Sequence, residues 1–184
     1  AIGQPSPAWF WSAVTIPVIH QIYVWLAWRL ELRSSATSRI IGFKSYLNLF
    51  FLLFGGRCVT LFALAWLDRG SLGLPTLPRV VLTGVFVLIG GYAMYSVKRY
   101  FVMARAAGAD HFDPRYRSMP LVDKGIFRYT SNGMYLYAFL LFWAIAVGFD
   151  SMSTLVGAAF SHLYIWIHIY ATEKPDMEYL HSKP

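Results

Sequence analysis

Long apolar runs dominate this chain, and one of them carries an arginine near its middle. The run from Tyr46 to Leu67 is long enough to cross a bilayer, because about 20 apolar residues span the hydrocarbon core. Arg57 lies near the centre of this run, where an arginine costs about 2.5–3.5 kcal/mol. We therefore expect an integral membrane protein in which Arg57 faces a partner, a cavity or a ligand rather than lipid.

The overall composition also indicates lipid as the solvent. Of the 184 residues, 57% are hydrophobic and only 14% are charged, whereas a soluble domain carries about 25% charged residues. The formal net charge of +7 would suggest a nucleic-acid partner for a soluble protein. In a membrane protein, basic loops that set the orientation explain it better, so we expect no nucleic acid. The length suits one integral membrane domain, residues 1–184.

Cys58 is the only cysteine in the chain. A single cysteine cannot form an internal disulfide or a thiol pair, which excludes a membrane disulfide-exchange enzyme. The first apolar run has no basic residue before it and is too long for a signal-peptide core, so we expect no cleaved signal peptide. We also expect no metal site.

Five apolar runs predict an all-α, polytopic membrane fold of about five transmembrane helices. These runs are Ala8–Leu30, Tyr46–Leu67, Val80–Val97, Met134–Phe149 and Thr154–Ala171. The fourth run is short. Asp150, Ser151 and Ser153 form a polar turn between the last two runs, so we expect these runs to make a C-terminal antiparallel helical hairpin.

Basic residues are distributed unevenly among the connections. The first connection, the loop 98–133 and the tail hold thirteen lysines and arginines, whereas the opposite side holds only Arg69 and Arg79. The positive-inside rule then predicts the N-terminus outside and the C-terminus in the cytosol. We expect a multi-pass protein of the endoplasmic reticulum or a bacterial inner membrane, with its active site facing the cytosol.

Two polar clusters lie where the predicted hairpin meets the cytosol. The first leads into the fourth helix, where Asn132 can cap the helix and its free N–H groups favour a polar or anionic ligand. The second follows the fifth helix and contains His168 and Glu173. A carboxylate at this place can hold a cationic group, although a solvated helix end terminated by Pro175 is the simpler alternative. The hairpin brings both clusters to one surface.

The segment Gly125–Phe139 resembles the signature of the membrane methyltransferases that include isoprenylcysteine carboxyl methyltransferase and phosphatidylethanolamine N-methyltransferase. Asn132, Met134 and Tyr135 match the phospholipid branch of this signature. The approach to it is matched by Leu121, Val122, Gly125 and Phe127. Glu173 resembles the first member of the family's glutamate pair. The resemblance covers residues 98–184, a signature region made of the loop, the hairpin and the tail.

The chain also departs from the family pattern. Gly133 replaces a proline, Tyr137 replaces a glycine, and Lys174 replaces the second glutamate. Ser131 stands where one branch has arginine. A glycine in place of proline loosens the start of the fourth helix.

The resemblance implies an S-adenosylmethionine-dependent methyltransferase that acts on a membrane lipid amine or a lipid-modified substrate. It implies catalytic roles for Asn132, Tyr135 and Glu173. The cofactor site that it implies consists of Leu121, Gly125, Phe127, Asn132, Met134, Tyr135, His168 and Glu173. Glu173 would pair with the cofactor's amino group and the helix N–H groups with its carboxylate, while the acceptor would arrive sideways between helices.

Several roles stay open at this point. Arg57 either binds the anionic headgroup or carboxylate of the acceptor, or is a structural arginine satisfied by helix carbonyls. A base that keeps an amine acceptor neutral has three candidates, His111, His168 and Tyr135, and each of them also suits a structural role.

Two other functions compete with methyl transfer. The changes at Gly133 and Lys174 suit a membrane protein of the same fold that has lost catalysis. A b-type haem electron carrier would instead use histidines on two helices as axial ligands, and His20 with His162 is the pair that the chain offers.

Overall fold

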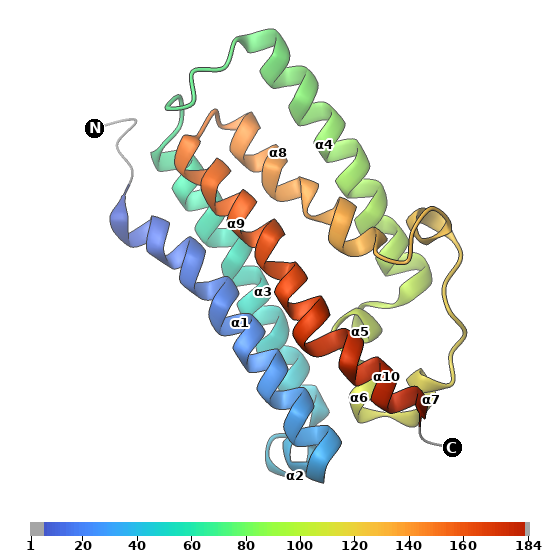
Figure 1. Ribbon diagram of the computed structural model, residues 1–184. Coiled ribbons are helices and arrows are strands. Elements are labelled where there is room, and N and C mark those ends of the chain that lie inside the picture. The colour runs from blue at the N-terminus through green and yellow to red at the C-terminus, as the bar shows by residue number, and fades with distance from the viewer. Residues whose placement is uncertain (1–5, 183–184) are drawn as a thin grey trace.

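The computed structural model describes residues 6–182, which form helices and no strand. The long elements in Figure 1 are α1 (Pro7–Ser34), α3 (Gly42–Leu67), α4 (Thr76–Ser96), α8 (Leu140–Gly148) and α9 (Met152–His168). The short ones are α2 (Ala36–Ile40), α5 (Met103–Ala106), α6 (Ala109–Phe112), α7 (Pro114–Arg117) and α10 (Lys174–Ser182). Apolar runs in lipid form helices because each backbone N–H and C=O then finds its partner within the segment.

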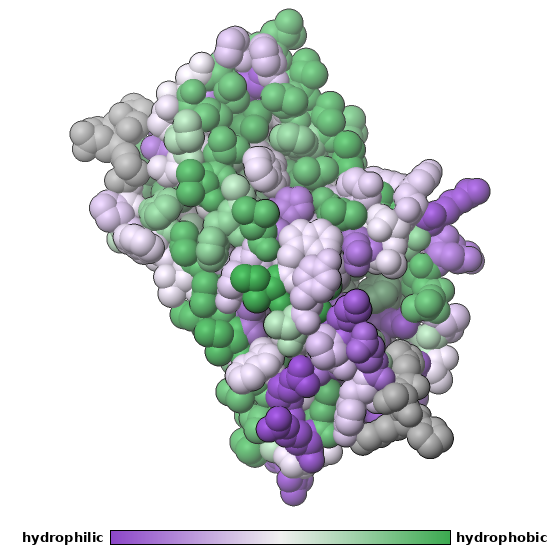
Figure 2. Space-filling model, viewed as in Figure 1, coloured by the Kyte–Doolittle hydropathy of each residue, from purple (hydrophilic) through white to green (hydrophobic). Residues whose placement is uncertain are grey.

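Four helical segments are long and apolar enough to cross a membrane: Pro7–Ser34, Gly42–Leu67, Thr76–Phe101 and Met152–Leu180. A shorter apolar segment, Met134–Gly148, includes α8. The predicted all-α polytopic fold with a short fourth member is therefore confirmed. Outward-facing leucines support this, since Leu88 and Leu163 are 74% and 71% exposed. Figure 2 shows apolar residues spread over the helices, with many hydrophilic ones gathered toward the lower end.

Helix α9 occupies the middle of the bundle. It packs against α1, α3 and α8, while α1 pairs with α3 and α4 pairs with α8. Helices α8 and α9 meet through the turn at Asp150 and Ser151, which confirms the predicted C-terminal hairpin. Although α3 and α4 are consecutive, the extensive contacts of α4 are with α8 rather than with α3 (Figure 1). Helices α3 and α4 therefore form two separate walls.

The bundle has two ends of different character. At the turn end, residues 68–75 connect α3 to α4 beside the α8–α9 turn, and at the loop end residues 97–133 and α10 gather. Three π-helical turns lie at the loop end: Val97–Phe101, Met134–Ala138 and Ile169–Glu173. Each widens a helix locally, and such turns frequently occur at functional sites.

Pro175 does not terminate the last helix, contrary to the simpler interpretation of its sequence. The π-helical turn at Ile169–Glu173 passes directly into α10, and Pro175 is the second residue of α10. A proline removes one backbone N–H from the helix. In the turn just before Pro175, the carbonyl of Ala171 accepts a hydrogen bond from Arg29 Nη2 at 3.4 Å. A side chain of α1 thus contacts the backbone where the two helical segments join.

The turn end is held together by the carboxylate of Asp68, which is 1% exposed. Its Oδ2 accepts hydrogen bonds from the hydroxyls of Ser71 and Ser151 and from the N–H of Ser153, each at 2.8 Å. Burial on its own would raise the pKa of Asp68, but these hydrogen bonds outweigh it and hold the pKa below the usual value of 3.8. Asp68 therefore joins the end of α3 to the start of α9.

Stability is expected to fall at acidic pH through Asp68. Because its folded-state pKa is lowered, the stabilisation is complete above the unfolded-state pKa and is lost as the pH falls through the folded-state value. In a neutral detergent, Asp68→Asn is expected to lower the free energy of unfolding at neutral pH by about 1–3 kcal/mol, since three donors lose a charged acceptor. Thermal unfolding followed between about pH 3 and pH 7 tests both effects. Asp123→Asn, at an exposed carboxylate, is the matched control. A pH profile of Asp68→Asn equal to that of the wild type would contradict the assignment.

Candidate functional site

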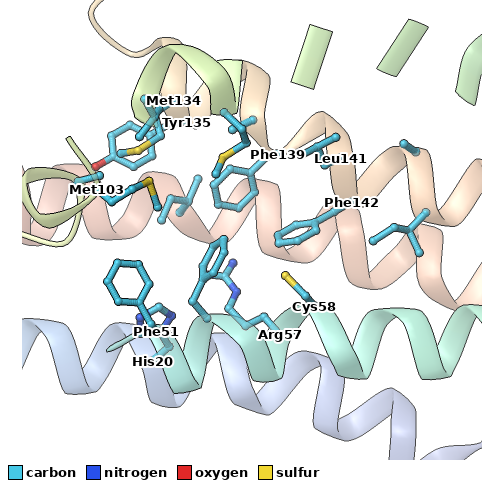
Figure 3. A pocket seen from close by; sticks show the side chains of 18 of the residues that line it. His20, Phe51, Arg57, Cys58, Met103, Met134, Tyr135, Phe139, Leu141 and Phe142 are labelled. Atoms are coloured by element: carbon cyan, nitrogen blue, oxygen red, sulfur yellow. The ribbon is translucent and has the colours of Figure 1, made fainter. Parts of the chain in front are cut away.

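A cavity of about 630 Å³ lies between α3 on one side and α4 and α8 on the other (Figure 3). This volume is typical of small-molecule sites. Aromatic and aliphatic side chains form most of its lining. Three of them, Phe51, Phe62 and Val87, are 37%, 49% and 47% exposed, so protein does not cover this side. The cavity is therefore open laterally, toward the region that lipid chains occupy around a membrane helix.

Arg57 lies in this cavity and is 3% exposed. Its Cζ atom stands 5.6 Å from the ring centroid of Phe139 and 5.7 Å from that of Phe142. Its Nε and Nη2 atoms are buried without a hydrogen-bond partner among the described residues. The structural interpretation of Arg57 required helix carbonyls as hydrogen-bond acceptors. Such carbonyls do not satisfy these two nitrogens. The expectation that Arg57 faces a cavity rather than lipid is confirmed.

Tyr135 and Glu173 meet at the loop end of the cavity. Tyr135 lies in the π-helical turn before α8 and Glu173 in the one after α9, and the Tyr135 hydroxyl donates a hydrogen bond to Glu173 Oε2. Asp110, at the start of the short helix α6, acts electrostatically on Glu173 but is itself paired with Arg105, whose Nε lies 3.4 Å from Asp110 Oδ2. The hairpin thus brings the two polar clusters of the sequence together and places the carboxyl group of Glu173 at this end of the site.

The other expected site residues divide into two groups. Met134 and His168 line the same cavity as Tyr135 (Figure 3 labels Met134 and Tyr135). Leu121, Phe127 and Asn132 are not among its lining residues. Leu121 is 90% exposed, and Phe127 is buried in a stack on Phe101 with ring centroids 5.2 Å apart.

The prediction that the Asn132 side chain caps the fourth helix is wrong. The Asn132 carbonyl accepts a hydrogen bond from the N–H of Leu136 at 2.9 Å, as at the start of a helix. Its side chain makes no capping hydrogen bond in the described chain, and the helical residues begin at Gly133. The N–H of Asn132 itself donates to Thr130 Oγ1 at 3.2 Å, so a local turn and not a side-chain cap leads into the helix.

Gly125 clamps the loop onto the end of α4. It begins the 3₁₀ turn Gly125–Arg128 with a φ of +61°, and a Cβ atom there would lie 2.5 Å from Ser96 Oγ. That hydroxyl accepts a hydrogen bond from the N–H of Ile126 at 3.0 Å. Both the left-handed backbone and the close approach require glycine. Its role in the site is therefore to position the segment that leads to Tyr135.

Gly133, which replaces the family's proline, is also explained by packing. A Cβ atom at Gly133 would lie 2.9 Å from Cγ2 of Ile126, and the N–H of Gly133 donates to the carbonyl of Thr130 at 3.2 Å. Proline would add the Cβ and remove the N–H. In this chain, close packing against Ile126 and the hydrogen bond to Thr130 therefore favour glycine over proline.

A buried cluster that the sequence did not indicate attaches the loop to the helices. The ring of His111 stacks on Trp28 at 3.9 Å between centroids. Its Nδ1 lies 3.2 Å from the carbonyl of Gly108, and its Nε2 lies 3.3 Å from Asp176 Oδ2. Asp176 is paired in turn with Arg29, Nη1 to Oδ1 at 2.8 Å. Both nitrogens of His111 are thus engaged, and no pattern in the sequence links these distant residues.

The two histidines that suggested a haem lie in different surroundings. His162 Nδ1 accepts a hydrogen bond from Trp143 Nε1 at 3.0 Å, and its ring stacks on Phe139. His20 lines the cavity beside Phe50. His162 therefore holds the two helices of the hairpin together.

The fold and the cavity define a polytopic helical membrane protein with an internal site that opens toward lipid. Residues 78–183, more than half of the chain, match the phospholipid methyltransferase family, and the chain belongs to this family. The resemblance expected from the segment Gly125–Phe139 is confirmed. Comparison with curated proteins and with solved structures gives no significant match. The matched region runs from the first turn of α4 into α10, so α1 and α3, with His20 and Arg57, lie outside it.

Gly125→Ala is expected to destabilise the loop end. The added Cβ meets Ser96 and forces a left-handed backbone on alanine, which together cost about 1–3 kcal/mol. Thermal unfolding in detergent measures the loss. Gly91→Ala is the matched control, because a Cβ there meets nothing within 4 Å. Equal midpoints for the two variants would show that Ser96 moves aside freely and that the clamp has no effect on stability.

Restoring the family's proline by Gly133→Pro is expected to weaken the protein rather than improve it. The variant loses the hydrogen bond to Thr130 and gains a close contact with Ile126, at a combined cost of about 1–3 kcal/mol. Gly133→Ala keeps the N–H and separates the two contributions. A rise in the unfolding midpoint of Gly133→Pro would contradict this explanation of the departure.

Proposed function

We propose that this protein is an S-adenosylmethionine-dependent methyltransferase whose acceptor is a membrane lipid amine or a lipid-modified molecule. The observation that carries the proposal is the pairing of Tyr135 with Glu173 at one end of a cavity that is open toward lipid. Both residues belong to the segment that matches the phospholipid methyltransferase family. Family membership supports a membrane methyltransferase. The Tyr135–Glu173 pair offers a polar binding site for a cofactor next to an apolar binding site for an acceptor.

The residues at the loop end fit the charges of this cofactor. Its amino group and sulfonium are cationic, and Glu173 provides a carboxylate, whereas Asp110 is paired with Arg105. A carboxylate is an acceptor-only group that suits an ammonium. The rings of Tyr135 and Phe139 line the neighbouring wall and attract positive charge through their faces. When bound, S-adenosylmethionine supplies a methyl group that is already activated by the sulfonium.

The chain's own residues then have mainly positioning roles. Glu173 accepts a hydrogen bond from the Tyr135 hydroxyl. This bond fixes the tyrosine ring between the proposed cofactor site and the cavity. The apolar lining excludes water from an acceptor that enters laterally, and alignment of reacting groups supplies most of the rate in such displacements. His168 lines the cavity, and its Nδ1 has no partner among the described residues, so it can form a hydrogen bond with an acceptor amine. His111, with both nitrogens engaged, cannot.

The proposed site faces the cytosol. This orientation follows from the basic residues of the loop 98–133 and its neighbours and the positive-inside rule. A cytosolic opening suits a water-soluble cofactor, whereas the lateral opening suits an acceptor that stays in the bilayer.

Calorimetric titration of the detergent-purified protein with S-adenosylmethionine and S-adenosylhomocysteine tests the proposal. Wild type is expected to bind both. Glu173→Gln is expected to weaken binding by about 10- to 100-fold, because a charge-assisted hydrogen bond contributes about 1.5–3 kcal/mol. Tyr135→Phe is expected to weaken it less, since the ring remains. Glu178→Gln, at an exposed glutamate of α10, is the matched control and is expected to bind as the wild type does.

Each outcome has a distinct meaning. A folded wild type that binds neither molecule overturns the cofactor assignment. Equal losses in Glu173→Gln and Glu178→Gln would move the cofactor away from Tyr135 and Glu173. Binding without methyl transfer to any lipid of a total membrane extract would favour the alternative of a family member that has lost catalysis.

A further inference from the structure

Unpartnered polar groups, most of them hydrogen-bond donors, are buried in the middle of the cavity. Nε and Nη2 of Arg57, Nε2 of Gln21 and the two ring nitrogens of His20, one of which is an acceptor in a neutral imidazole, lack partners among the described residues. These three side chains are 3%, 8% and 4% exposed, and all of them line the cavity. Figure 3 shows His20 of α1 and Arg57 of α3 on the same side of it. All three belong to helices outside the family-matched segment.

The cavity offers Arg57 no counter-charge. No aspartate or glutamate is among the lining residues, and the two carboxylates of the site, Glu173 and Asp110, belong to its loop end. The faces of Phe139 and Phe142 attract the guanidinium only weakly at 5.6 and 5.7 Å. A buried cation without a partner is unfavourable. The planar guanidinium has the geometry that binds a phosphate or a carboxylate through two parallel hydrogen bonds.

The position of Arg57 separates this donor group from the place of methyl transfer. Phe139 and Phe142 follow Tyr135 by four and seven residues, which corresponds to about 6 and 10 Å along a helix. Figure 3 shows Tyr135, Phe139 and Phe142 in this order, with Arg57 facing the phenylalanines. Beyond them the lining is apolar, apart from Thr83, as far as Phe62 and Phe149 near the turn end. The cavity thus has an acidic end, a cationic middle and an apolar depth.

We propose that Arg57, supported by His20 and Gln21, binds one anionic group, a phosphate or a carboxylate, at the head of an amphiphile whose chain lies in the cavity. That this amphiphile is the methyl acceptor rests on the proposed function, whereas the anion site itself does not. The bound anionic group is then not the group that is methylated, because it lies about 6–10 Å deeper in the cavity than Tyr135. The acceptor carries its reacting group at the far end of a short head, beyond its own anion.

Binding of single-chain probes to the purified protein in a neutral maltoside tests the site without any cofactor. The probes share a twelve-carbon chain and differ in the head: dodecyl phosphate, dodecanoate, dodecanol and dodecyltrimethylammonium. Wild type is expected to bind one or both anions about 10-fold more tightly than dodecanol, or better, and the cation least. Comparing the affinities for dodecyl phosphate and dodecanoate identifies the preferred anion. Inorganic phosphate alone is expected to bind much more weakly because it lacks the chain.

Variants separate ligand binding from structure. Arg57→Met is expected to abolish the preference for anions, and Arg57→Lys to keep part of it. Arg33→Met, at an exposed arginine of α1, is the matched control. In the ligand-free protein, Arg57→Met is expected to leave the unfolding midpoint unchanged or higher, because it removes an unpaired buried cation. A structural arginine would instead lose stability on this substitution.

The outcomes distinguish this proposal from the previous one. Equal affinity of the wild type for dodecyl phosphate and dodecanol overturns the anion site, and this measurement stands even if Arg57→Met does not fold. A loss of S-adenosylmethionine affinity in Arg57→Met with unchanged binding of the amphiphiles also overturns it, since Arg57 would then serve the cofactor. Anion-selective binding in a protein that binds no S-adenosylmethionine would support this site and reject the methyltransferase.

Discussion

The bilayer interior offers no hydrogen-bonding partner, and this constraint shapes both the backbone and the site. Helices satisfy the backbone, so polar side chains are the groups that must find partners inside the bundle. Asp68 does so with three donors at the turn end, and His111 with Asp176 at the loop end. Arg57, with its neighbours His20 and Gln21, does not, since the Nε and Nη2 atoms of Arg57 find no partner among the described residues and lie in a cavity. We propose that a ligand binds at this place.

Departures from regular helix geometry gather where the proposed chemistry lies. The π-helical turns at Met134–Ala138 and Ile169–Glu173 carry Tyr135 and Glu173, and the hydrogen bond between these residues joins the two turns. The second turn precedes Pro175, and the carbonyl of Ala171 within it accepts a hydrogen bond from Arg29. A side chain of α1, a helix that the family match does not include, thus contacts this widened turn.

The charges along the cavity give the two proposals a common physical basis. Carboxylates at the loop end suit a cationic, water-soluble cofactor, and a cation about two helical turns deeper suits an anion held by an apolar chain. A lipid-like acceptor oriented by Arg57 would present its opposite end to Tyr135. The matched family segment provides the first of these places, and the N-terminal helices provide the second.

The sequence by itself determined the class of fold and the family, because the apolar runs have membrane-spanning lengths and the motif around Asn132, Met134 and Tyr135 is local. It also indicated that Tyr135 and Glu173 converge, since a short turn leaves a hairpin little freedom. Only the tertiary structure decided that Phe127 and His111 are packing residues, that Asn132 does not cap, and that Gly133 is matched to Ile126. These properties depend on contacts between residues far apart in the chain, such as Trp28 with His111 and Arg29 with Asp176. Hydropathy and local motifs carry no information about such contacts, which arise only when five helices pack together.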